Sequence, residues 1–350
     1  MPVYLYDISG AVRIESAFRI DDLAHHRVND LDDVDVRLVE YTGGEPTGGS
    51  RFGKYVWNEQ DRTATVDLGP RLRGQLRVLA DSVEFAFTPL YFRFAQIRPL
   101  VLWSISHTIR RTGGGMLYAA GVARPNGGGV LLFGPPGVGK TTTAARLARE
   151  WDYRLLGDDK VLVDGGTIHG IHNRIGLRHD SPVSGRGGTH AGRSSTARTM
   201  VPDAVRSAYR SIAPRWTRSL VDALRSRLFD TGQHTFVRAS TVAPTVDRAP
   251  LECCLLLRPS TDRVEVTQVG VDEMIYRVTQ TNLTDPGLKH DLVTAYMFCD
   301  SRTELFLSLG DEERIRSLLG DRVCYEVRAP TEDLCRVIAE EVGRTEASPL

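Results

Sequence analysis

The sequence has 350 residues, of which 41% are hydrophobic and 25% charged, and its 44 basic residues equal its 44 acidic residues. These proportions are typical of a globular chain that buries one large core or two medium ones, and they exclude a disordered protein. A formal net charge of zero argues against a protein-wide field that would draw the chain to nucleic acid or to a membrane surface.

Targeting and redox features favour a cytoplasmic protein. No apolar run approaches the roughly 18 residues that a membrane-spanning helix needs, so no membrane contact is expected. The first residues, MPVYLYDISG, lack the basic and apolar regions of a signal peptide. The five cysteines form no Cys-x-x-Cys motif, and an odd number argues against a disulfide framework and for a reducing compartment.

Residues 1–112 are predicted to form a β-rich N-terminal domain that ends in a helix. Six segments alternate polar and apolar residues or are rich in β-formers, and turn residues separate them. The expected strands cover residues 3–8, 11–15, 34–39, 63–67, 75–79 and 83–87. Residues 89–112 follow a helical pattern, and the glycines at 113–115 mark its end. This part of the sequence contains no nucleotide or metal motif.

The next segment carries a complete phosphate-loop motif, G-x-x-x-x-G-K-[ST]. The apolar run 129–133 predicts a buried strand before the motif, and residues 141–150 predict a helix after it. A strand, a glycine-rich loop and a helix in this order distinguish a P-loop from a chance match. The candidate nucleotide-binding residues are Gly134, Pro135, Pro136, Gly137, Val138, Gly139, Lys140, Thr141 and Thr142.

The chemistry of this loop depends on its backbone. Glycines allow the chain to wrap closely around an anion, and the N–H groups of the loop and of the helix N-terminus point towards it. Lys140 is expected to reach the β- and γ-phosphates, and the Thr141 hydroxyl is expected to ligate Mg²⁺. Thr142 is a further candidate for phosphate contact.

A pair of aspartates lies eighteen positions after Lys140, at the end of a predicted strand over 153–156. The following residues, 160–169, predict a β-hairpin. Two adjacent carboxylates near Mg²⁺ and a triphosphate can divide the work, because one can hold the metal while the other accepts the proton of an incoming hydroxyl. Repulsion between them raises the pKa of one. The alternative is a solvated Gly-Asp-Asp turn without a chemical role.

Together, Leu117–Ala123, the phosphate loop and the Gly157-Asp158-Asp159 motif resemble the HPr kinase/phosphorylase-like P-loop kinases, which share the fold of phosphoenolpyruvate carboxykinase. The resemblance is specific over 117–164 and looser beyond it. It implies an α/β P-loop kinase domain over 113–344, followed by a tail over 345–350.

The resemblance also implies residue roles. Asp158 would be the catalytic base, with Lys140 as a second catalytic group, and Asp159 would hold Mg²⁺ together with Thr141. Many members of the family have a histidine where this chain has Tyr118. The resemblance therefore does not imply a reverse phosphorylase reaction for this chain, and it does not identify HPr as the substrate.

An arginine-rich stretch follows the hairpin. Residues 174–227 contain eleven arginines, no lysine and three acidic residues, and a mobile insertion is predicted near 180–230. Three interpretations stay open: a lid that neutralises phosphate charge, solvated helix faces, and a contact with nucleic acid or an acidic protein. Arg174 and Arg178 are the candidate anion contacts.

The sequence therefore predicts an ATP-dependent kinase, with ATP or another nucleoside triphosphate and Mg²⁺ as cofactors. Its γ-phosphoryl group would pass to a hydroxyl of a protein, a peptide or a small molecule, and the sequence does not identify this acceptor. The alternatives are a nucleotide-binding regulator or scaffold without phosphotransfer, and a carboxykinase-like reaction, which needs further His and Lys residues that no motif locates. The family resemblance leaves room for a homo-oligomer.

Overall fold

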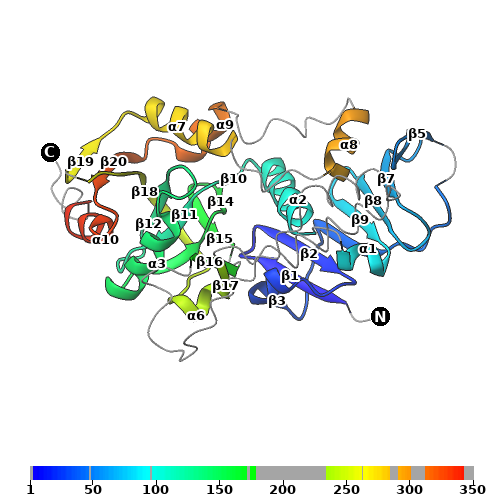
Figure 1. Cartoon of the computed structure of the whole chain (residues 1–350), viewed down its shortest axis with the longest axis horizontal. Coiled ribbons are helices and arrows are strands. Elements are labelled where there is room, and N and C mark those ends of the chain that lie inside the picture. The colour runs from blue at the N-terminus through cyan, green and yellow to red at the C-terminus, as the bar shows by residue number, and fades with distance from the viewer. Residues whose placement is uncertain are drawn as a thin grey trace, which may run out of the picture.

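The structure is a computed structural model that describes residues 3–46, 49–94, 97–171, 174–178, 234–261, 263–283, 291–300 and 312–342. Within these ranges the strands form two nine-stranded sheets and one two-stranded ribbon, with helices packed on the sheets (Figure 1). The chain thus has the mixed α/β class that the sequence predicts.

The first sheet is built from residues before the phosphate loop. Its strand order is β3-β1-β2-β4-β9-β8-β7-β6-β5, with β2, β4 and β9 parallel to one another and the other pairs antiparallel. Its elements are β1 (Tyr4–Ile8), β2 (Val12–Ser16), the 3₁₀-helix η1 (Asp21–His26), β3 (Arg27–Val28), β4 (Val36–Glu40), β5 (Ser50–Phe52), β6 (Tyr55–Asn58), β7 (Thr63–Asp67), β8 (Arg73–Val78) and β9 (Val83–Phe87). The six predicted strands are present within a few residues, and β3, β5 and β6 are additional.

Three helices cover this sheet. The predicted helix over 89–112 is described as α1 (Pro89–Phe94) and α2 (Ile97–Arg111), with residues 95 and 96 outside the described ranges. Helix α2 packs in the same core as the aromatic residues of β9. The third helix, α8 (Asp291–Cys299), comes from the other half of the chain and packs on β6, β7 and β8 (Figure 1, orange). Trp57 and Tyr296 meet edge to face with ring centroids 5.4 Å apart. A domain boundary at 112 stays a prediction, because α8 contributes to this core.

The second sheet carries the phosphate loop. Its main path is β10-β14-β15-β18-β12-β11-β13, and β20 pairs with both β18 and β19. Its strands are β10 (Gly115–Leu117), β11 (Ala120–Ala123), β12 (Gly129–Phe133), β13 (Arg154–Gly157), β14 (Val161–Asp164), β15 (Thr167–Gly170), β18 (Arg248–Pro259), β19 (Glu265–Gln268) and β20 (Val323–Ala329). The predicted hairpin after the double aspartate is the pair β14 and β15.

Helices lie on both faces of this second sheet. On β12, Val130 and Leu132 join the core under one layer of helices, whereas Leu131 and Phe133 join the core under the other. The first layer contains α3 (Lys140–Glu150), α6 (Ala239–Val242), α10 (Leu334–Val337) and the π-helical turn η4 (Ile338–Val342). The second layer contains α7 (Val271–Leu283) and α9 (Glu312–Leu319). The alternation of β12 therefore produces a three-layer arrangement with a continuous apolar strand at its centre.

The last helices are short in the described residues. Helix α9 is described from Glu312 onward, and α10 begins at Leu334 and leads directly into the π-helical turn η4. The proposed mobile insertion near 180–230 and the tail over 345–350 lie outside the described residues.

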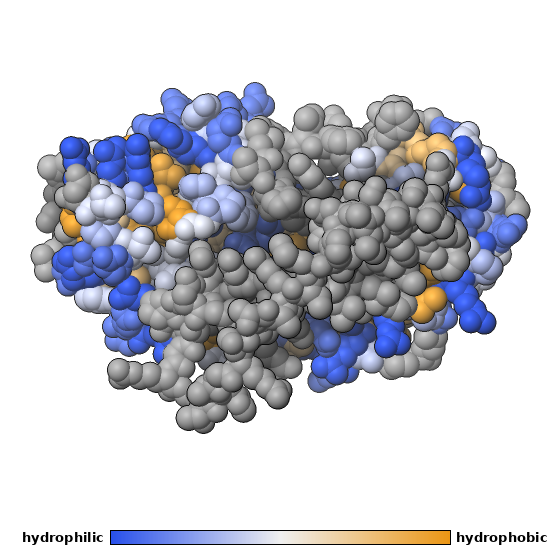
Figure 2. Space-filling model, viewed as in Figure 1, coloured by the Kyte–Doolittle hydropathy of each residue, from blue (hydrophilic) through white to orange (hydrophobic). Residues whose placement is uncertain are grey.

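The described residues that are visible on one side of the molecule form a mainly hydrophilic surface (Figure 2). In the described residues visible in Figure 2, hydrophilic side chains predominate at both ends of the long axis, and apolar patches are small. The exposed large hydrophobic residues of the described ranges are Val3, Val264 and Tyr276. In the same ranges, we find no helix with the length and hydrophobicity needed to cross a membrane.

Candidate nucleotide-binding site

Strand direction brings the two sequence motifs to one edge of the second sheet. Because β11 is antiparallel to both β12 and β13, these two strands run in the same direction. The phosphate loop leaves the end of β12, and the Gly157-Asp158-Asp159 turn leaves the end of β13. Tyr118 precedes β11, whose N-terminal end lies at this same edge. The eighteen-residue spacing thus corresponds to one helix and one strand that return the chain to its starting edge.

The phosphate loop has the backbone of an anion-binding nest. Gly134, Gly137 and Gly139 have φ angles of 149°, 84° and 99°, in the left-handed region that favours glycine. A Cβ on Gly134 would lie 2.8 Å from a methyl group of Val138, so this position has no room for a side chain. The tip of the loop, from Pro135 to Gly137, is exposed, and α3 begins directly after the loop. The open tip and the helix N-terminus together suit a polyphosphate.

Lys140 lies across this loop. Its side chain is buried, and its Nζ donates hydrogen bonds to the carbonyl oxygens of Gly134 at 2.7 Å and Pro135 at 3.3 Å. The same ammonium group lies 4.3 Å from the centroid of the Tyr118 ring. The loop's own carbonyl groups and one aromatic ring therefore hold the positive charge at the loop.

The two motifs are joined by a direct hydrogen bond. The Thr141 hydroxyl donates to the Oδ1 of Asp158 at 2.6 Å, and Asp158 is only 8% exposed. Burial, reinforced by the negative charge of Asp159, raises the pKa of Asp158 from 3.8 to about 7, although the Thr141 hydrogen bond and the charge of Lys140 oppose the shift. A carboxylate with this pKa is close to half ionised at neutral pH, as a general base requires.

A tight turn positions the second aspartate. Asp159 has a φ of 62°, and across it the Lys160 N–H donates to the Asp158 carbonyl at 2.7 Å. A Cβ on Gly157 would lie 2.9 Å from the Lys160 carbonyl oxygen, so glycine is needed at the start of this turn. Asp159 is more exposed than Asp158. The two neighbouring carboxylates therefore occupy different environments.

The donor set at this edge fits Mg²⁺. A hydroxyl and two carboxylates supply the hard oxygen ligands that this ion prefers, and the Thr141 and Asp158 oxygens are already adjacent. The sequence pairs Thr141 with Asp159 as metal ligands, whereas the structure brings the Thr141 hydroxyl to Asp158. The division of roles between the two aspartates stays a prediction. The structure describes no cluster of three or more His, Cys, Asp or Glu side chains suited to a metal within its ranges.

For the other residues that the sequence predicts at the site, the described part of the structure gives the position in the chain but no contact with the phosphate loop. Thr142 is the third residue of α3 and is partly buried. Arg174 and Arg178 are the two end residues of β16 (Arg174–Arg178), which pairs with β17 (His234–Arg238) as a separate ribbon. Their side chains, like the other predicted arginines up to 227, lie outside the described part.

Sequence reasoning missed three residues around this site. Lys160 is 4% exposed, and its Nζ lies 4.5 Å from the centroid of the Tyr118 ring. Tyr118 stands out in the sequence as the position of the family's histidine, but nothing there indicates its contacts with two lysines. Asn282 of α7 accepts a hydrogen bond from the Tyr118 N–H at 2.9 Å, and no sequence signal links these distant residues.

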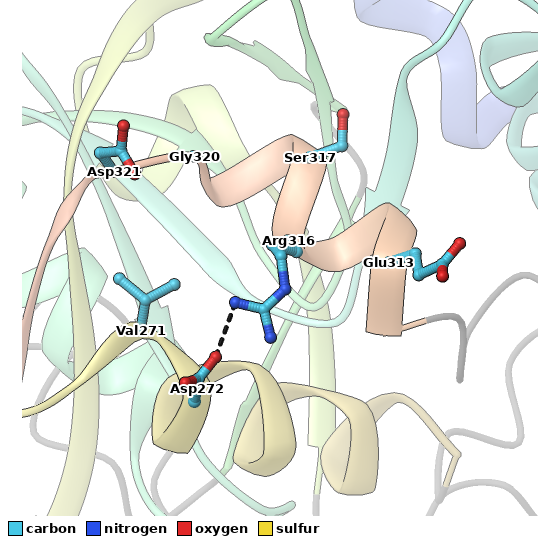
Figure 3. A pocket seen from close by; sticks show the side chains of 7 residues that line it. All are labelled: Val271, Asp272, Glu313, Arg316, Ser317, Gly320 and Asp321. Atoms are coloured by element: carbon cyan, nitrogen blue, oxygen red, sulfur yellow. Dashed lines mark ion pairs between the residues drawn. The ribbon is translucent and has the colours of Figure 1, made fainter.

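A surface hollow between α7 and α9 is separate from this site. Its lining includes Asp272, Glu313, Arg316 and Asp321, and Arg316 pairs with Asp272 at 2.6 Å (Figure 3). None of the phosphate-loop or double-aspartate residues lines it.

Comparison with known families finds one match. Residues 130–165 match the model of the family described as ATPase family associated with various cellular activities (AAA). The matched stretch contains both the phosphate loop and the double aspartate. A search of curated proteins gave no match. The match supports the P-loop NTPase superfamily, with nucleotide binding and hydrolysis, and it does not single out the HPr kinase-like family.

Proposed function

We propose that this protein is an ATP-dependent kinase of the HPr kinase-like type that transfers the γ-phosphoryl group to a hydroxyl. The observation that carries the proposal is the buried Asp158 carboxylate, in hydrogen-bond contact with Thr141 and next to the charge of Lys140. A base with a pKa near neutrality at a phosphate loop is suited to removing a proton from an acceptor.

In the proposed reaction, Asp158 takes the proton of the acceptor hydroxyl as its oxygen bonds to the γ-phosphorus. The bond from that phosphorus to the oxygen bridging the β- and γ-phosphates breaks, and ADP leaves with the electron pair. Lys140 and the loop N–H groups stabilise the charge on the phosphates. Thr141 and Asp159 would hold Mg²⁺, which supplies further charge neutralisation when it is bound.

A second candidate, NTP hydrolysis, is favoured by the AAA family match. The same carboxylate would then activate water instead of an alcohol, and no stable phosphorylated product would form. The two functions share the nucleotide site and differ only in the acceptor, for which the candidates are a protein, a peptide or a small molecule.

The deciding experiment incubates the purified protein with γ-labelled ATP, Mg²⁺ and a cell extract separated into protein, peptide and metabolite fractions. Transfer of label to one fraction supports the kinase, whereas release of inorganic phosphate alone, without any labelled acceptor, supports hydrolysis. ATP binding with neither product would indicate a regulator or scaffold.

Two matched variants test the roles of the aspartates. Asp158→Asn should bind ATP within about twofold of wild type and lose at least about a thousandfold in transfer rate, because the base is removed while the carboxamide keeps the shape. Asp159→Asn should instead raise the Mg²⁺ concentration needed for half-maximal activity, by about tenfold. Equal transfer rates for Asp158→Asn and wild type would show that Asp158 is not the base. If Asp159→Asn lost transfer and Asp158→Asn needed more Mg²⁺, the roles of base and metal ligand would be reversed.

A further inference from the structure

The Tyr118 ring connects two buried lysines that are distant in sequence. Lys140 belongs to the phosphate loop, and Lys160 follows the double aspartate. Their ammonium nitrogens lie 4.3 and 4.5 Å from the centroid of this one ring. The two charges are therefore separated by no more than the sum of these distances, well within the range over which buried charges act on one another.

The position of this ring is fixed from several sides. Tyr118 is only 9% exposed, and its N–H is bound by the side-chain oxygen of Asn282, which is itself buried in α7. The backbone of Tyr118 is therefore anchored to α7, and its ring lies within reach of the phosphate-loop lysine. The face of an aromatic ring attracts an ammonium group, so the ring gives each lysine a preferred place.

The turn after β13 explains how Lys160 reaches this position. The left-handed conformation of Asp159 and the hydrogen bond from the Lys160 N–H to the Asp158 carbonyl reverse the chain within three residues. Lysine is rarely buried, and a surface hairpin would leave it in solvent. Here it is 4% exposed at the same edge as the loop that binds phosphate.

We propose that Lys160 is a second cationic ligand for the terminal phosphate of a bound nucleoside triphosphate, with Tyr118 as the positioning residue for both lysines. The inference rests on the proposed nucleotide site and adds a contact to the γ-phosphate. Lys140 contacts the loop carbonyls and would serve the phosphates that lie in the nest. Lys160 directly follows Asp158 and Asp159 in the chain, and in the proposed reaction the transferred group lies beside these aspartates. Two cations near one phosphoryl group raise the positive potential where charge accumulates during transfer.

The test measures binding only. ATP and ADP, each with Mg²⁺, are titrated calorimetrically into wild type, Lys160→Met and Lys160→Arg. Lys160→Met should weaken ATP at least about tenfold and ADP less than about twofold, because only ATP has the γ-phosphate. Lys160→Arg should keep most of the preference for ATP. Lys54→Met is the matched control, because the Lys54 ammonium also lies over a tyrosine ring, that of Tyr55, but in the first sheet; both affinities should stay at the wild-type value.

Variants of Tyr118 test the inference independently, even if the Lys160 variants do not fold. Tyr118→Phe keeps the ring face and should bind both nucleotides as wild type does, whereas Tyr118→Leu should weaken ATP more than ADP. An unchanged ratio of ATP to ADP affinity in both Lys160→Met and Tyr118→Leu would overturn the inference. Wild-type protein that binds ATP without transferring its phosphate would contradict the proposed kinase and leave this test intact. Wild-type protein that binds neither nucleotide would overturn both.

Discussion

Each of the two large sheets carries an aspartate with little exposure to solvent, and the two carboxylates have opposite electrostatic settings. In the first sheet, burial would raise the pKa of Asp67, but hydrogen bonds from Arg51 and Arg73 outweigh it and hold the pKa below its usual value. In the second sheet, burial and a neighbouring carboxylate raise the pKa of Asp158. Similar architecture therefore supports a neutralised ion pair in one region and a carboxylate with a raised pKa in the other.

The two carboxylates differ in how far neighbouring groups of the protein neutralise their charge. Asp67 meets two guanidinium groups at 2.8 and 2.9 Å, so it is already neutralised by the protein. Asp158 instead meets a hydroxyl, and the nearby cation Lys140 is engaged with the phosphate loop. A charge that is only partly compensated costs stability and is available for binding or catalysis.

The largest expected effect on ATP affinity distinguishes the lysines of the two regions. Lys140→Ala should weaken ATP binding at least about a hundredfold, because it removes the side chain expected to contact the β- and γ-phosphates. Lys54→Ala removes a lysine from a tyrosine ring of the first sheet and should change ATP affinity by less than about twofold. Calorimetric titration measures both. Equal affinities for wild type and Lys140→Ala would remove the phosphate site from this loop.

The pH dependence of stability should separate the two aspartates. The raised pKa means that folded Asp158 keeps its proton while the unfolded chain ionises from about 3.8, so wild-type stability falls as pH rises from there to about 7 and then levels off. Relative to wild type, Asp158→Asn should therefore gain on the order of 1–3 kcal/mol in free energy of unfolding between about pH 4.5 and about pH 8. Urea unfolding without Mg²⁺ or nucleotide measures it.

Asp67→Asn is the matched variant for this experiment. The lowered pKa of Asp67 gives stability that is complete above the unfolded value and is lost only as pH falls through the folded pKa. The variant should therefore be destabilised by about 2 kcal/mol at both pH values, with no change between them. If the free energies of unfolding of the two variants changed with pH in the same way, the opposite pKa shifts of Asp67 and Asp158 would be refuted.

A smaller effect is expected at the turn that presents the aspartates. Gly157→Ala places a methyl group 2.9 Å from the Lys160 carbonyl oxygen and should lower the free energy of unfolding by about 1–2 kcal/mol, with a larger proportional loss of ATP turnover. Gly44→Ala is the control, because a Cβ there meets nothing within 4 Å. Thermal unfolding compares the two, and equal stability would show that the turn adjusts without cost.

The sequence predicts the local structure around the phosphate loop better than the contacts between distant segments. The phosphate loop, its flanking strand and helix, and the hairpin after the double aspartate depend on nearby residues and are found where the patterns place them. The contact of Lys160 with Tyr118 cannot be predicted from the sequence, because it requires two loops to meet at one edge of the sheet. The short strands β5 and β6 were missed for a related reason, since they extend the sheet next to a glycine-rich turn cluster whose composition indicates only loops.

Some of what the sequence could not indicate lies in the return of the chain to the first sheet. The sequence of α8 does not indicate which strands the helix packs on. In the structure, Tyr296 packs on Trp57 and Asp300 pairs with Arg62. Strands β6, β7 and β8 are therefore synthesised long before α8, and this face of their sheet is covered only once residues 291–299 have left the ribosome. Until then the nascent chain leaves Trp57 without its partner helix, and exposed apolar surface of this kind favours aggregation during synthesis.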